Sequence, residues 1–115
     1  PISTLPTGEI DLDALAEAVT RNMDGTECRK GVVLNINVGT TVKGAVDSLG
    51  GALKVLDVLG VAREDRFVHC DGALFALMLP FLDEDAIPAD KAVSFLQDID
   101  SMAVSGHKML GCKSS

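Results

Sequence analysis

Apolar residues in the first forty positions recur first at helical spacing and then without interruption. Between residues 12 and 23 they return every third or fourth position, and Asp11 is placed to cap the first turn, so an amphipathic helix is predicted. Residues 31–38 form the next apolar segment, and its first four positions are continuously nonpolar. Such a run is typical of a strand in a parallel sheet whose two faces are both covered.

The middle of the chain predicts a second helix and a second strand. Residues 44–59 favour a helix that turns its leucines inward, although two adjacent glycines inside it also allow a turn followed by a shorter helix. Residues 63–66 are all charged and predict a surface turn, and residues 67–70 follow as a strand. Residues 73–82 are apolar but contain a proline, which indicates a short buried helical segment or an irregular crossing.

The last part of the chain predicts a third strand. Residues 83–90 form an acidic loop, residues 91–100 favour one or two helical turns, and residues 102–105 are a short apolar strand. The order of helix, strand, helix, strand, irregular segment and strand is that of an α/β protein with a mostly parallel sheet and flanking helices. In such sheets ligands bind outside the carboxyl ends of the strands.

Polar residues of different chemistry follow each predicted strand. They are Thr40-Thr41 after the first strand, His69 and Asp71 at the second, and Ser105, His107 and Lys108 after the third. If the strands are parallel neighbours, these groups meet at one crevice. A desolvated lysine amine can form an imine with an aldehyde, and a carboxylate can keep a heteroaromatic nitrogen protonated. A hydroxyl can bond a ring substituent, so the set suits a polar aromatic aldehyde such as pyridoxal phosphate.

Each of these groups also has a purely structural explanation. Asp71-Gly72 is a common turn pair, and Thr40-Thr41 could cap the following helix. Lys108 could be an ordinary surface charge, His69 a strand residue with a satisfied ring, and Gly106 a source of a positive φ angle. The coincidence of three strand ends is what favours a shared site.

Composition narrows the classes of function. The chain has 115 residues, 47% of them hydrophobic and 3% aromatic, so one modest domain with an aliphatic core is expected. Its net charge is −7 without a basic stripe, which argues against nucleic acid as a partner. No apolar run reaches the roughly 18 residues that span a bilayer, and no secretory signal is visible. We therefore expect a cytoplasmic protein with no membrane contact.

The three cysteines support the same compartment. Cys28, Cys70 and Cys112 are scattered along the chain, and none belongs to a Cys-x-x-Cys pair. This spacing predicts reduced thiols rather than a disulfide framework, and it gives no zinc-site pattern, so no metal is expected.

Three segments resemble the pyridoxal-phosphate-dependent group II amino acid decarboxylases, in the histidine decarboxylase and plant serine decarboxylase branch. The segments are residues 35–47 (Asn-Ile-Asn-Val-Gly-Thr-Thr-Val-Lys-Gly-Ala-Val-Asp), residues 67–74 (Phe-Val-His-Cys-Asp-Gly-Ala-Leu) and residues 104–112 (Val-Ser-Gly-His-Lys-Met-Leu-Gly-Cys). The resemblance covers nearly the whole chain. Together the three segments are specific for the family, and much less specific for the substrate.

The resemblance implies roles for individual residues around pyridoxal phosphate. Lys108 would carry the cofactor as a Schiff base, and Asp71 would keep its pyridine nitrogen protonated. Ala73 would pack against one face of the ring, and Thr41 would approach its phenolic oxygen. The remaining residues of this wall would be Ser105 and His107 near the phosphate, with His69 and Asp47 in less defined roles.

The resemblance also implies a fold and a reaction. Residues 1–115 would be the central segment of the large domain of a fold-type I transferase, incomplete at both ends. The parent enzyme, a homodimer, would remove the α-carboxyl group of an amino acid, with histidine or serine as substrate. The alternative is a non-catalytic truncated fragment that lacks the phosphate cradle and the C-terminal domain and acts, if at all, by association with a full-length subunit. Other chemistry on the same scaffold, such as aldehyde-forming decarboxylation, β-elimination or transamination, also stays open.

Overall fold

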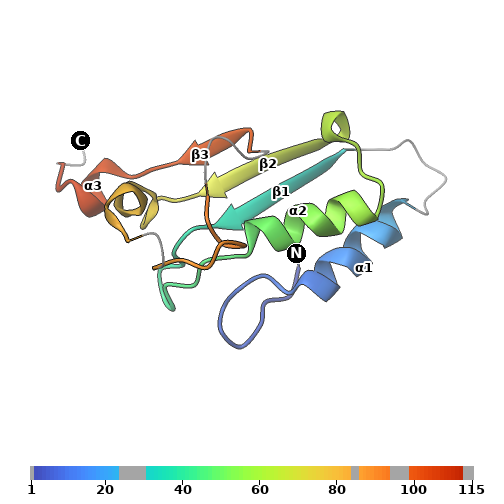
Figure 1. The fold of residues 1–115 in the computed structure, drawn as a ribbon, viewed down its shortest axis with the longest axis horizontal. Coiled ribbons are helices and arrows are strands. Elements are labelled where there is room, and N and C mark those ends of the chain that lie inside the picture. Colours follow the sequence, from blue (N-terminus) through green and yellow to red (C-terminus); the bar gives the residue numbers. More distant parts are fainter. Residues whose placement is uncertain (1, 24–30, 84–85, 94–98, 113–115) are drawn as a thin grey trace.

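The structure, a computed structural model, describes residues 2–23, 31–83, 86–93 and 99–112 (Figure 1). Within these ranges, four helices or helical turns precede or separate the strands, and one follows them. In chain order the elements are α1 (Leu12–Met23), β1 (Val32–Asn37), α2 (Leu49–Val58), a 3₁₀ turn (Arg63–Asp65), β2 (Arg66–Asp71), a 3₁₀ helix (Ala76–Phe81), β3 (Ser101–Ala103) and α3 (Gly106–Met109).

The three strands form one sheet in the order β1-β2-β3, and both pairings are parallel. Asn37 of β1 pairs with Asp71 of β2, and Asp71 pairs with Ala103 of β3, so the strands end at the same level. All three point toward the end of the molecule where α3 lies (Figure 1). The predicted α/β class with a parallel sheet is therefore confirmed.

Helices α1 and α2 lie together on one side of the sheet and bury its inner face (Figure 1). The core is aliphatic, as the composition indicates, and its fully buried members are Leu15, Leu34, Ile36, Val38, Leu49, Ala52, Leu56, Val68 and Cys70. On the other face Val33 is 77% exposed and Phe67 is 46% exposed. The prediction that both faces are covered is wrong for the described part of the chain, because α1 and α2 both pack on the face of Leu34 and Ile36.

Helix α2 begins later than residue 44, and the alternative of a turn with a shorter helix is the correct one. Ser48 is its N-cap, and the Ser48 hydroxyl accepts a hydrogen bond from the Gly51 amide at 3.1 Å. A Cβ at Gly51 would lie 2.7 Å from Leu12 Cδ1, and one at Gly50 would lie 3.2 Å from the Asp90 carbonyl oxygen. The two glycines therefore let the first turn of α2 pass close to α1 and to the loop around residue 90.

Helix α2 ends in a Schellman motif. Gly60, with φ of 74°, donates from its amide to the Asp57 carbonyl, and the Val61 amide donates to the Leu56 carbonyl. This motif ends the helix as predicted and turns the chain toward β2.

Arg66 is the main correction near β2. It was expected in a surface turn, but it is the first residue of β2 and is buried, with its guanidinium 2.6 Å from Asp57 Oδ1. Pairing with a carboxylate of α2 lowers the cost of burying this guanidinium.

The final third differs from the sequence prediction in detail. The segment at Ala76–Phe81 is a 3₁₀ helix that includes Pro80, and it is only partly buried, since Phe81 is 83% exposed. Strand β3 starts and ends earlier than predicted. The helical turns expected at residues 91–100 fall partly on residues 94–98, outside the described residues. No helix of the described ranges is both long and apolar enough to cross a bilayer.

Candidate functional site

A pocket of about 160 Å³ lies at the carboxyl edge of the sheet. It brings together the last residue of β1 and residues that follow it, the last residue of β2 and residues that follow it, and one residue of α3. They are Asn37, Gly39, Thr40 and Thr41, then Asp71, Ala73 and Leu74, and finally Lys108. Five of the residues expected at a shared site therefore line one cavity: Thr40, Thr41, Asp71, Ala73 and Lys108.

Asp71 ends β2 and is exposed, with its backbone held on both sides. Its carbonyl accepts from the Val38 amide at 2.8 Å, and the next amide, of Gly72, donates to the Ala103 carbonyl at 2.9 Å. Its carboxylate Oδ1 accepts from the Ala73 amide at 3.1 Å, which is an Asx turn. The Asx turn uses only Oδ1, and no described residue donates to Oδ2. Asp71 can therefore form the turn and bind a ligand at the same time.

Gly39 after β1 and Gly72 after β2 allow the chain to turn away from the sheet with close packing at both strand ends. A Cβ at Gly72 would lie 2.3 Å from the Ala76 Cβ, a distance that no side chain tolerates. Gly39 has φ of 89°, and a Cβ there would lie 2.7 Å from the Phe75 Cβ. Phe75 and Ala76 therefore pack directly against the two strand ends, and Ala73 and Leu74 of the same segment line the pocket.

The two threonines have different surroundings. Thr40 Oγ1 accepts from the Ala45 amide at 3.0 Å, and the Thr40 amide donates to the Ala45 carbonyl at 2.9 Å. Thr41 is exposed, and its hydroxyl has no partner within the described residues. The alternative that Thr40-Thr41 caps the next helix is wrong, because Ser48 is the cap.

Lys108 lies on α3, and its side chain is exposed. Gly106 is the first residue of this short helix and has no positive φ angle, contrary to one of the explanations considered for it. Ser105 Oγ lies 2.9 Å from His107 Nδ1, so these two side chains bind each other, and neither lines the pocket. Their contacts with a phosphate stay a prediction.

His69 lies two residues before Asp71, on the open face of the sheet. Its Nδ1 is 2.7 Å from Ser101 Oγ of β3, which gives the ring the satisfied strand position considered for it. It does not line the pocket, and its contact with a cofactor stays a prediction.

Asp47 is 1% exposed and lies behind the pocket rather than in it. Its carboxylate accepts from the backbone amides of Ile10 at 2.6 Å and Asn37 at 2.7 Å, and from Asn37 Nδ2 at 3.0 Å. Asn37 itself lines the pocket and was not among the predicted site residues. The available signal was the alternation along β1. Ile36 and Val38 are buried, so Asn37 between them is a polar residue on the opposite face, three positions before Thr40.

The lining chemistry fits the ring and aldehyde end of pyridoxal phosphate. The pocket presents an amine, a carboxylate with a free oxygen, a threonine hydroxyl and an amide, which are the groups that such a ring requires. Lys108 is the single basic residue among the described residues of the lining, so the pocket offers no second cation for a phosphate. Among the described residues no three His, Cys, Asp or Glu side chains are grouped as metal ligands.

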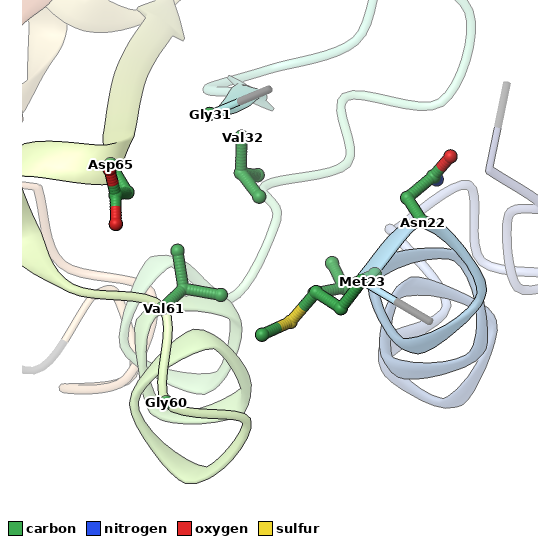
Figure 2. A pocket seen from close by; sticks show the side chains of 8 residues that line it. Asn22, Met23, Gly31, Val32, Gly60, Val61 and Asp65 are labelled. Atoms are coloured by element: carbon green, nitrogen blue, oxygen red, sulfur yellow. The ribbon is translucent and has the colours of Figure 1, made fainter. Parts of the chain in front are cut away.

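A second pocket, of about 60 Å³, lies at the opposite end of the sheet, between the ends of α1 and α2 (Figure 2). Met23 and Val61 face each other across it, and Val32 lies at the start of β1 (Figure 2). Its lining is mainly apolar, with Asn22 and Asp65 as its polar residues. This chemistry offers neither a nucleophile nor a base next to an acid.

Comparison with known proteins gives relatives over almost the whole chain. No protein-family model matches the sequence. Serine decarboxylase 1 of Oryza sativa subsp. japonica is 46% identical over 112 residues, which are 96% of this chain and 21% of the relative. Histidine decarboxylase of Solanum lycopersicum is 39% identical over 114 residues, 99% of this chain and 25% of the relative. The chain thus spans about a fifth to a quarter of these relatives.

Solved structures share the fold. Mouse CSAD in its apo form superimposes with a TM-score of 0.69 at 21% identity, over 96% of this chain and 21% of that one. L-methionine decarboxylase from Streptomyces sp. 590 superimposes with a TM-score of 0.65 at 25% identity, over 97% of this chain and 31% of that one. Over nearly all of its length, the chain is therefore similar to one segment of serine and histidine decarboxylases, which are members of the pyridoxal-phosphate-dependent group II amino acid decarboxylase family.

Proposed function

We propose that residues 1–115 are the central segment of an enzyme that binds pyridoxal phosphate and removes the α-carboxyl group of an amino acid, histidine or serine. The observation that carries the proposal is that Lys108, Asp71 and Thr41 line one pocket although they come from three separate segments. The relatives are named serine and histidine decarboxylases, which supports these two substrates.

Lys108 is the residue that attaches the cofactor. Its amine is the single one in the described lining, and it stands on the short helix directly after β3. When bound, pyridoxal phosphate supplies an aldehyde for this amine and a protonated ring that accepts the electron pair left by a departing carboxyl group.

Asp71 and Thr41 hold the ring. The Oδ2 of Asp71 would accept a hydrogen bond from the protonated ring nitrogen, and the negative charge of the carboxylate would keep that nitrogen protonated. The Thr41 hydroxyl donates to the ring oxygen, and the small side chain of Ala73 leaves room for the flat face of the ring. Ser105 and His107 lie within three residues of Lys108 in the chain and would belong to the phosphate end. His69 lies on the same face of β2 as Asp71, and its ring bonds Ser101.

The complete activity belongs to a longer polypeptide. The relatives are about four to five times as long as the segment that they share with this chain, as the covered shares of 21% and 25% imply. We infer that most of the phosphate contacts lie in that remainder, because the described lining has one basic residue. For the whole enzyme we propose a cytoplasmic homodimer with a free amino acid as substrate.

A second candidate function is favoured by the open face of the sheet. Val33 and Phe67 are register partners and both are exposed there. An apolar face of a parallel sheet is normally covered. The chain by itself would then be a non-catalytic piece that associates with a full-length subunit through this face.

Borohydride trapping tests the first proposal. Borohydride reduces a carbon–nitrogen double bond between the cofactor and an amine to a stable single bond, so even a short-lived adduct is retained. After incubation with pyridoxal phosphate, reduction and digestion, we expect the label on the peptide that contains Lys108. Lys91 is the internal control, because its ammonium pairs with Glu9 at 2.7 Å.

Two variants sharpen the test. Lys108→Arg should abolish the label, and Asp71→Asn should reduce it at equal cofactor concentration, because an amide cannot balance the charge of the ring nitrogen. Label distributed evenly over the lysines, or retained in Lys108→Arg, would sink the assignment. Trapped cofactor without release of carbon dioxide from histidine or serine would favour the non-catalytic fragment.

A further inference from the structure

The pair formed by Asp47 and Asn37 is the most enclosed polar contact next to the pocket. The Asp47 carboxylate is 1% exposed and accepts from three donors, two of which belong to Asn37. The third donor is the amide of Ile10, in the segment that leads into α1. Asp47 also donates its own amide to the Asn37 carbonyl at 2.9 Å. Asn37 is therefore held by backbone and side chain together.

This arrangement determines which end of the Asn37 amide faces the pocket. A carboxylate only accepts hydrogen bonds, so the Nδ2 end must point at Asp47 and the Oδ1 end must point away from it. Asn37 lines the pocket, and no described residue donates to its Oδ1. The amide oxygen is thus an acceptor whose orientation is enforced from behind.

A second acceptor, the Asp71 carboxylate, lies beside Asn37 on the adjacent strand. Asn37 and Asp71 are register partners on adjacent strands, and both line the pocket. In a parallel sheet, register partners place their side chains on the same face at neighbouring positions. The pocket therefore has two acceptors side by side, one charged and one neutral.

We propose that Asn37 is a further ligand-binding residue of this pocket and that Asp47 is its positioning residue. Asn37 Oδ1 provides a second acceptor for the proton-bearing ring nitrogen of the cofactor, next to Asp71. The inference rests on the proposed function, because it takes pyridoxal phosphate as the ligand. The positioning role explains why the carboxylate of Asp47 is buried behind the end of β1, at a place where an apolar residue would otherwise complete the core.

The test compares two ligands that differ at one atom. The first is pyridoxal phosphate, and the second is its carbocyclic analogue, in which a CH group replaces the ring nitrogen. Dissociation constants for both are measured by absorbance on the 115-residue chain. Asn37→Ser keeps a hydroxyl donor near Asp47 but lacks the second acceptor, so it should bind pyridoxal phosphate about two- to tenfold more weakly, as expected for one hydrogen bond. Its affinity for the analogue should not change.

Asp47→Asn tests the positioning role. Its amide lets Asn37 rotate by half a turn and present Nδ2 to the pocket, so the preference for pyridoxal phosphate over the analogue should fall by a similar factor. Asn35→Ser is the matched control, because Asn35 is exposed on the same strand, pairs with His69 and does not line the pocket. It should leave both dissociation constants unchanged. If Asp47→Asn does not fold, Asn37→Ser decides alone.

The outcomes separate the two proposals. Equal ligand preference in the wild type and in Asn37→Ser, with borohydride label still on Lys108, overturns the role of Asn37 and leaves the proposed function standing. Loss of affinity for both ligands by the same factor assigns Asn37 a purely structural role and also overturns the inference. A wild-type chain that traps no cofactor on Lys108 overturns the proposed function and this inference together.

Discussion

Asn37 and Asp71 are register partners at the last positions of β1 and β2. One residue later the Val38 amide still donates to the Asp71 carbonyl at 2.8 Å, and then both segments leave the sheet. Because the two strands are parallel and end at one level, the residues that follow them reach the same space. This one pairing explains how Thr41, Ala73 and the strand ends come to share a pocket.

Gly72→Ala should destabilise the fold at the site. The new methyl group would lie 2.3 Å from the Ala76 Cβ, so the helical segment would have to move away from β2. We expect the free energy of unfolding to fall by about 1–3 kcal/mol, the usual cost of overpacking, measured by urea denaturation. Adding Ala76→Gly should restore part of this loss. A Gly72→Ala chain as stable as the wild type would contradict the close approach.

Asp100 should make stability depend on acid pH. The hydrogen bond from the Arg63 guanidinium, at 2.5 Å, and that from the Val68 amide, at 2.7 Å, lower the pKa of the Asp100 carboxyl from its ordinary value. A lowered pKa in the folded state means stability that is present above the unfolded pKa of about 4 and lost as the pH falls through the folded value. Asp100→Asn should therefore be less stable than the wild type at neutral pH.

The difference between Asp100→Asn and the wild type should shrink as the pH falls below about 4, because the wild-type carboxyl then becomes protonated. Urea denaturation at several pH values measures it. Asp90→Asn is the control, because Asp90 bonds Ser48 at the other end of the sheet rather than an arginine. A difference that stays constant down to the lowest pH would exclude the proposed linkage.

The two described cysteines should differ in reactivity. Cys70 is buried in the core, and burial raises the pKa of its thiol to about 11, so few thiolates form at pH 8. Cys112 is an exposed free thiol. In the folded chain iodoacetamide should alkylate Cys112 much faster than Cys70, as followed by peptide mass spectrometry. In urea the two rates should become similar, and equal rates without urea would contradict the burial of Cys70.

Truncations on the two faces of β1 should differ in cost. Ile36 is fully buried under α1 and α2, so Ile36→Ala should lower the free energy of unfolding by about 2–5 kcal/mol. Val33 is 77% exposed on the other face, so Val33→Ala should change it by less than about 0.5 kcal/mol. Similar losses for both would mean that the second face is also covered in solution.

The elements were predictable where one local signal dominates. The spacing of Leu15 and Val19 indicates α1, and the apolar run at Leu34 indicates β1, because both patterns reflect a face turned to the core. The start of α2 was less certain from sequence, since two glycines lower helix propensity. Only the packed structure shows that Gly51 is needed where α2 passes Leu12.

Some residues of the candidate site were also predictable from the sequence, and others were not. Asp71 and Lys108 were predictable as polar residues at strand ends, a rule that needs only strand order. Asn37 was not, because its importance comes from Asp47, ten positions later and brought back by the turn between them. Arg66 was misplaced for a related reason, since its partner Asp57 lies on the preceding helix.

By itself the sequence determined the α/β order, the parallel sheet and the segments that carry Thr41, Asp71 and Lys108. Hydrophobic periodicity and the residue types at strand ends are local properties, so they can be recognised in the sequence without knowledge of the tertiary contacts. Only the tertiary structure showed which face of the sheet is covered. It also showed that the Asp71 carboxylate is exposed and the Asp47 carboxylate is buried, and that Asn37 lies beside Asp71. Those features depend on contacts between segments that are distant in the sequence. The hydrogen bond between Asn37 Nδ2 and the buried Asp47 carboxylate is one example, because it fixes an orientation of the Asn37 side chain that the local sequence pattern does not specify.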